Sequence, residues 1–333
     1  RPPLSAALLI LASLPSLAVP SPIPECIRAP ATFAPLDPIG AHSILAPIDP
    51  ALAPIACFDL AFPPSLEVQR AVDDAMRPIL DRYQLDARWP GAANTPISLT
   101  WSFVPDGLSI PSALGDPPGQ SELFAQMDLK FSLQGGRATW LAQFQSCFDR
   151  WAALTGLSYT RIADEGDDGA AWGLPGAPGL RGDIRIAMKP IDGNGGVLAY
   201  NFFPTFGLSP GDMVLDSSEG WNGAAGSYAF MRNVISHEQG HGIGLRHVCP
   251  FSNTKLMEPF ISTAYNGPQH DDLRSAVRHY GDAYEPNNAP SHATPLAPVS
   301  VGSILSPSDT PAPFIANTTL TAISIDTDED WFR

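Results

Sequence analysis

The chain has 333 residues and a formal net charge of −15, with 19 basic side chains against 34 acidic ones. A surplus of acid this large argues against nucleic acid or an anionic membrane surface as a partner, because both repel negative charge. The length suits one or two domains with extensions.

The N-terminal part carries an apolar run over residues 4–19. This run is too short for a comfortable membrane span and has the length of a signal-peptide core, and Ser16 and Ala18 offer small residues for a cleavage site. We therefore expect residues 1–18 to be a signal peptide and the protein to be secreted, with the cell surface as a further location. A buried apolar segment is the alternative. No later stretch is long and apolar enough for us to expect a membrane span.

Residues 19–85 are rich in Pro and Ala, and we expect this composition to form little regular structure. The segment is either a prosegment or a spacer, and both interpretations stay open. The four cysteines are even in number, so an exported protein can pair them. One possible bridge joins Cys147 to Cys249.

Residues 86–283 have the pattern of a folded domain. Alternating hydrophobicity over residues 97–104 predicts a first strand. Apolar side chains at helical spacing over residues 140–154 predict an amphipathic helix that ends at Gly156. Four further short β-rich stretches, separated by Gly, Asp and Pro turns, lie at residues 157–162, 183–188, 196–203 and 212–216.

Two more helices are predicted, over residues 228–243 and 271–280, the second with its apolar side chains on one side. Together these elements predict an α+β domain, in which a twisted mixed five-stranded sheet packs against three helices.

The second helix carries the most informative motif of the chain. His237 and His241 are four residues apart, so their imidazoles project from one helix face and can hold one metal ion. Gly244 can end the helix with a positive φ and turn the chain so that His247 supplies a third nitrogen. Three imidazoles leave one tetrahedral position open, as a hydrolytic zinc requires. Glu238 lies beside them, where its carboxylate can act as a general base.

This motif, with Met257 following in Lys-Leu-Met-Glu-Pro, resembles the metzincin zinc endopeptidases. Within that clan the segments "GGVLAYNFFP", "GDMVLD" and "GPQHDDLRSAVRHYGD" resemble the matrixins, in the same order. The resemblance implies one catalytic zinc on the three histidines, Glu238 as general base, Met257 as the apolar floor beneath the metal, and protein or peptide substrates. We expect a monomer.

The same resemblance implies a calcium site, because a Gly-rich loop with hard oxygen ligands suits this cation. An ordinary polar turn is the alternative. The implied residues are Asp192, Gly193, Gly195, Val197, Asp216 and Glu219.

The chain also departs from the matrixin pattern. The His-x-Asp pair of the structural zinc is missing, and Tyr200 and Val214 stand at its other two ligand positions, so we expect only the catalytic zinc. The latency motif Pro-Arg-Cys-Gly is absent too. Cys26 or Cys57 could supply such a thiol, but a disulfide or an inert thiol is the simpler interpretation.

Residues 284–333 resemble the start of the bacterial pre-peptidase C-terminal domain, a small β-sandwich, through "AYEPNNAPSHATPL" and "ISIDTDEDWFR". A disordered acidic tail is the alternative. Because too few strands remain to close a sandwich and no initiator Met is present, we expect the printed chain to be a fragment at both ends.

The sequence therefore predicts a secreted zinc-dependent endopeptidase. One alternative is an exported matrix- or polymer-binding surface protein with a structural metal centre. Another is a metzincin relative that cleaves amide bonds in small or cell-wall substrates. Glu238 argues against the first alternative, because a structural site has no use for an unligated carboxylate at that position.

Overall fold

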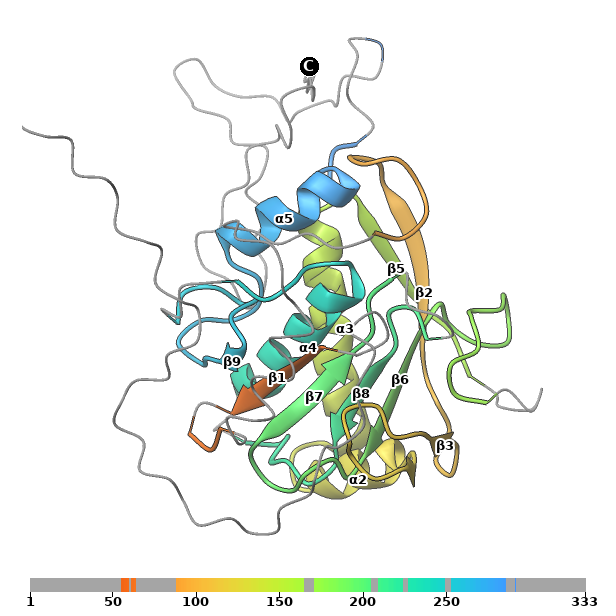
Figure 1. Ribbon diagram of the computed structural model, residues 1–333, viewed down its shortest axis with the longest axis vertical. Coiled ribbons are helices and arrows are strands. Elements are labelled where there is room, and N and C mark those ends of the chain that lie inside the picture. The colour runs from red at the N-terminus through yellow and green to blue at the C-terminus, as the bar shows by residue number, and fades with distance from the viewer. Residues whose placement is uncertain are drawn as a thin grey trace, which may run out of the picture. The chain divides into compact units, whose positions relative to one another are not determined.

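The computed structural model, drawn in Figure 1, describes residues 55–59, 61–63, 88–164, 171–204, 209–223, 227–248, 253–285 and 291. All of them lie in one compact unit, Asp37–Arg333. The predicted signal peptide and almost all of the predicted C-terminal β domain fall outside the described residues. No helix among the described residues is long and apolar enough to cross a membrane.

The main sheet has seven strands in the order β5-β2-β6-β8-β7-β1-β9. Strands β5, β2, β6 and β8 run parallel, β7 is antiparallel to β8, β1 is antiparallel to β7, and β9 is parallel to β1. The strands are β1 (Ile55–Asp59), β2 (Ile97–Phe103), β5 (Leu157–Arg161), β6 (Ile184–Lys189), β7 (Val197–Asn201), β8 (Met213–Asp216) and β9 (Phe260–Ile261); β3 (Ser109–Ile110) and β4 (Gly119–Gln120) pair separately.

The five predicted strands correspond to β2, β5, β6, β7 and β8, and the predicted α+β class is confirmed. Strands β1 and β9 extend the sheet beyond the prediction. The expectation that residues 19–85 form little regular structure is wrong for Ile55–Asp59. The composition of the whole segment hides this short apolar stretch, whose first four residues become buried when it pairs with β7 and β9.

Four helices are described: α2 (Leu123–Lys130), α3 (Gly136–Leu154), α4 (Ala229–Gly242) and α5 (His270–Tyr280). The last three are the predicted helices, and α2 is additional. Figure 1 shows α3 and α4 side by side against the sheet, with α5 near one end of them. Helix α4 contacts β7, β8, β1 and β9, so the metal motif faces the end of the sheet that contains β1.

Aromatic side chains fix α3 on the sheet. Trp101 of β2 stacks on Phe148 of α3 with ring centroids 4.4 Å apart, and such pairs add stability beyond their burial. Trp151 of α3 then donates its indole N–H to the Ser236 carbonyl of α4 at 3.1 Å. The apolar spacing of α3 therefore also determines where α4, and with it the metal motif, lies.

The opposite face of the sheet carries the two positions that the sequence analysis assigned to a lost zinc site. Tyr200 and Val214 are both fully buried there in an apolar cluster. The Tyr200 hydroxyl donates to the Asp116 carboxylate at 3.4 Å, and Asp116 forms a buried ion pair with Lys189. The polar side chains around Tyr200 thus form an ion pair and a hydrogen bond with one another.

Candidate metal centre

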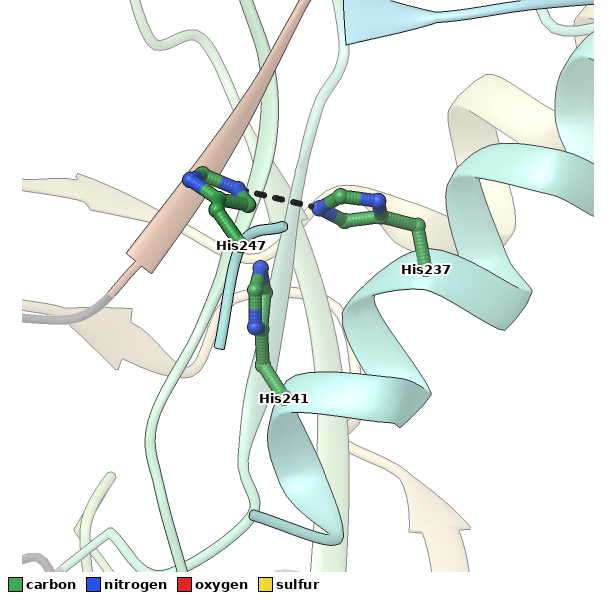
Figure 2. Close-up of side chains that lie close together, drawn as sticks. All are labelled: His237, His241 and His247. Atoms are coloured by element: carbon green, nitrogen blue, oxygen red, sulfur yellow. Dashed lines mark hydrogen bonds between the residues drawn. The ribbon is translucent and has the colours of Figure 1, made fainter. Parts of the chain in front are cut away.

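Helix α4 and the turn after it bring three imidazoles together. Figure 2 shows His237 and His241 on successive turns of α4, with His247 returning toward them from the following segment. Gly244 has a φ of 94°, the left-handed conformation that the sequence analysis required of it. The ring centroids lie 4.6 to 5.2 Å apart. The three residues singled out by their spacing do converge.

Backbone carbonyls orient two of these rings. His237 Nδ1 lies 2.6 Å from the Leu256 carbonyl oxygen, and His241 Nδ1 lies 2.6 Å from that of Leu245. Because a carbonyl only accepts, each Nδ1 carries the proton and each Nε2 presents a lone pair. His237 Nε2 lies 3.2 Å from His247 Nε2, and among the described groups His241 Nε2 has no hydrogen-bond partner.

This arrangement fits a metal ion. Zinc–nitrogen distances near 2.0–2.1 Å in a tetrahedron place ligand nitrogens about 3.3 Å apart, close to the distance between His237 and His247. Within the described part of the chain, these histidines are the only group of at least three His, Cys, Asp or Glu side chains that could hold a metal ion.

Burial keeps the imidazoles neutral. It lowers the pKa of His237 to about 4, although the hydrogen bond to Leu256 opposes this shift. Burial and the neighbouring histidines also lower the pKa values of His241 and His247 well below their usual range. The rings therefore keep the lone pairs that a cation needs at neutral pH.

Glu238 is fully buried beside these rings, and neither carboxylate oxygen has a hydrogen-bond partner of normal geometry among the described residues. Burial raises its pKa to about 8, a rise that the nearby thiol and backbone N–H of Cys57 in β1 partly oppose. A buried carboxylate without a partner is costly, and such a group beside three converging imidazoles is typical of a functional site.

The turn around Met257 packs against α4 and contacts the His237 ring through the Leu256 carbonyl. A Cβ atom on Gly240 of α4 would clash with the Met257 sulfur, so a side chain at this position would require Met257 to shift. Asp272 of α5 accepts hydrogen bonds from the backbone N–H groups of Leu256 and Met257. The Leu256 carbonyl also contacts the His237 ring. Asp272 is therefore linked to His237 through the peptide unit between Leu256 and Met257. Asp272 was not predicted from the sequence; its place as the third residue of α5, in a capping box with Gln269, was the available signal.

The residues predicted to bind calcium form an acidic cluster. Gly193 and Gly195 have positive φ angles, and the Val197 N–H donates to Asp192. Backbone N–H groups also donate to the other two carboxylates, those of Asp216 and Glu219. Burial raises the pKa values of Asp192 and Glu219 to about 7. The structure brings these side chains to one loop region without assembling them into a group that could hold a metal ion.

Two of the four cysteines are described. Cys57 and Cys147 are both free and buried, and burial raises the pKa of Cys147 to about 12. Cys26 and Cys249 lie outside the described residues, and with them the predicted Cys147–Cys249 bridge.

Comparison with known proteins finds the family described as Matrixin over residues 131–281. Matrix metalloproteinase-18 of Xenopus laevis is 32% identical over 163 residues, which cover 45% of this chain and 31% of that protein. Stromelysin-3 of Mus musculus is 32% identical over 189 residues, covering 52% of this chain and 34% of that protein. Neutrophil collagenase of Homo sapiens is 28% identical over 204 residues, covering 58% and 39%.

The chain thus spans about a third of the length of these relatives. The matched residues include α4, α5 and the Met257 turn but not β1 or β2. The resemblance to matrixins inferred from the sequence is confirmed over this region.

Proposed function

We propose, from the premise that residues 131–281 form a matrixin domain of the zinc metalloendopeptidase class, that the chain hydrolyses peptide bonds of proteins. The observation that carries this proposal is the buried carboxylate of Glu238, which has no partner of normal geometry beside three converging imidazoles. A structural zinc site takes four protein ligands. Only three are gathered within the described residues, which favours a catalytic site over the polymer-binding alternative.

His237, His241 and His247 would hold the zinc through their Nε2 atoms. When bound, zinc supplies Lewis-acid chemistry toward the scissile carbonyl and the attacking water. The carbonyls of Leu256 and Leu245 hold the His237 and His241 rings in the required tautomer. Met257 fills the space under the rings and touches no reacting atom.

Glu238 moves the proton. Its carboxylate takes one from the attacking water and returns it to the amine nitrogen of the leaving group. Among the described residues neither oxygen accepts a hydrogen bond of normal geometry, so only the contact with the Cys57 thiol and N–H has to give way before the base acts. The apolar surroundings exclude other water, which strengthens the electrostatic interactions within the site.

We propose that calcium binds the loop around Asp192 as a structural ion, with Asp216 and Glu219. The carboxylates of Asp216 and Glu219 are buried, and that of Asp192 is exposed on the same Gly-rich turn. This supports the site, because a divalent cation would offset the mutual repulsion of the three carboxylates. The backbone carbonyls of Gly193, Gly195 and Val197 are the further candidate ligands. Secretion through residues 1–18 agrees with such a role, since calcium is plentiful outside cells.

The test is a quenched fluorescent peptide assay on the purified chain with one equivalent of zinc. We expect turnover that a zinc chelator abolishes and zinc restores, and we expect Glu238→Ala to keep zinc and lose turnover. Casein and peptidoglycan fragments separate a protein substrate from a cell-wall substrate. A chain that holds zinc but cleaves no peptide would contradict the proposal.

A further inference from the structure

We propose that Trp89 and Tyr280 are positioning residues of the metal centre, whose side chains hold the end of α4 and thereby place His241 and His247. This inference rests on the proposed zinc peptidase function and adds two residues that act on it through the backbone. Tyr280 is the last residue of α5 and lies within the residues matched to the matrixins, whereas Trp89 precedes β2 and lies outside them.

The end of α4 has carbonyl oxygens that the helix itself cannot satisfy. The last four carbonyls of any α-helix lack a partner within the helix. Backbone N–H groups of the following turn satisfy three carbonyls near the end of α4, including that of His241, which accepts from Gly244 at 2.8 Å. The next two carbonyls, those of Gly242 and Ile243, are bonded by side chains from distant parts of the chain.

Trp89 and Tyr280 supply these two donors. The Trp89 indole N–H donates to the Gly242 carbonyl at 2.8 Å, and the Tyr280 hydroxyl donates to the Ile243 carbonyl at 2.9 Å. The Trp89 backbone N–H donates in turn to the Tyr280 hydroxyl at 3.3 Å, so the two residues form one unit, the Trp89–Tyr280 clamp. Both residues are buried. Water therefore does not readily replace a donor that is lost.

Neighbouring groups fix the two rings of the clamp. A Cβ atom on Gly211 would lie 2.7 Å from the Trp89 ring, so the chain passes very close to this indole. The Arg88 guanidinium lies over the Tyr280 ring at 4.9 Å from its centroid, and it donates to the Thr95 carbonyl at 3.1 Å. Because the rings are packed in this way, their donors point in fixed directions.

The two clamped carbonyls lie between two of the proposed zinc ligands. Gly242 directly follows His241 in the chain. Ile243 precedes Gly244, whose φ of 94° turns the chain toward His247. The clamp therefore holds the segment that determines how far apart these two imidazoles lie.

The clamp should act on His241 more than on His237. The Leu245 carbonyl, 2.6 Å from His241 Nδ1, belongs to the clamped turn. The Leu256 carbonyl, 2.6 Å from His237 Nδ1, belongs to a different segment. A shift of the clamped turn would disturb the first contact and leave the second in place, whereas a general loss of stability would affect both.

The first experiment measures zinc affinity of the full chain by competition with a chromophoric chelator. Trp89→Phe and Tyr280→Phe each remove one donor of the clamp and keep an aromatic ring. The matched controls are Trp140→Phe and Tyr200→Phe, which each remove one hydrogen bond to a carboxylate elsewhere. We expect the zinc Kd to rise about tenfold in each clamp variant, and to stay close to wild type in the controls. Wild-type affinity in both clamp variants, or an equal loss in the controls, would overturn the proposal.

The second experiment examines the imidazoles without zinc and without catalysis. In the zinc-free chain labelled with ¹⁵N-histidine, nuclear magnetic resonance distinguishes the two neutral tautomers of each ring. We expect His241 to lose its single Nδ1-protonated form in the clamp variants, while His237 keeps it. Equal changes in both rings, or none in His241, would overturn the proposal. Clamp variants that behave as expected in a chain that cleaves no peptide would refute the peptidase function alone.

Tyr280→Phe protects the test against misfolding, because it removes a single oxygen atom and keeps the buried ring. Circular dichroism of each zinc-free variant shows whether it has folded. If Trp89→Phe does not fold, Tyr280→Phe decides the question by the same two measurements. Wild-type zinc affinity and an unchanged His241 tautomer in folded Tyr280→Phe would then show that the clamp only packs.

Discussion

The metal centre and the acidic loop differ in how their ligand atoms are held. In the candidate metal centre, His237 and His241 each commit one nitrogen to a backbone carbonyl, which leaves the other nitrogen free to bind a cation. In the acidic loop, the oxygens of Asp192 and Glu219 already accept hydrogen bonds from backbone N–H groups. The histidines thus present lone pairs that could bind a cation without rearrangement, whereas the acidic loop is already hydrogen-bonded and a cation would have to reorganise it.

This difference follows from the ligands. An imidazole has one donor and one acceptor when neutral, so fixing the donor aims the acceptor. A carboxylate has about four lone-pair positions, and backbone N–H groups can use some while a cation uses others. We therefore expect tight, function-determining zinc binding and weaker calcium binding that acts on stability.

The largest effect should come from Glu238→Gln. Removing the base should lower kcat about 10²–10⁴-fold, with the zinc content by elemental analysis unchanged. Asp149→Asn, an exposed carboxylate on α3, is the control and should have no effect. Undiminished turnover in Glu238→Gln would break the assignment of the base.

Calcium removal tests the other half of the comparison. A calcium-selective chelator should lower the melting temperature by about 5–10 °C if calcium is present at about 100 times its Kd, while zinc stays bound. Asp192→Asn should remove this response. An unchanged melting curve in the wild-type chain would mean that the acidic loop is an ordinary polar turn.

Asp272→Asn tests how the metal centre is supported. The substitution weakens the acceptor for the N–H groups of Leu256 and Met257, and Leu256 orients His237. We expect zinc affinity to fall about 10–100-fold in competition with a chromophoric chelator. The neighbouring Asp271→Asn should leave affinity as it is. Equal affinity in both variants would show that the turn keeps its position without Asp272.

The smallest effect should come from Met257→Leu. Leu has nearly the same volume as Met and should fill the same space against Gly240. The free energy of unfolding, measured with denaturant, should therefore fall by less than about 1.5 kcal/mol. Zinc stoichiometry should stay at one. A loss of zinc would show that the floor does more than pack.

Local spacing accounts for what the sequence predicted well. The four-residue step from His237 to His241 and the glycine at 244 act through helix geometry over a few residues. Periodicity also located α3, α4 and α5, because a buried helix face repeats at every turn. The strands β2, β5, β6, β7 and β8 were predicted from short β-rich stretches bounded by turn residues.

The features that only the tertiary structure decided depend on contacts between distant segments. Cys57 meets Glu238 because β1 inserts between β7 and β9, and about 180 residues of chain separate the two side chains. Asp272 reaches His237 only because α5 folds back onto the Met257 turn. The sequence of a strand does not show which other strands it will pair with. The sequence by itself therefore determined the chemistry of the centre, whereas long-range pairing decided what covers it and what holds it in place.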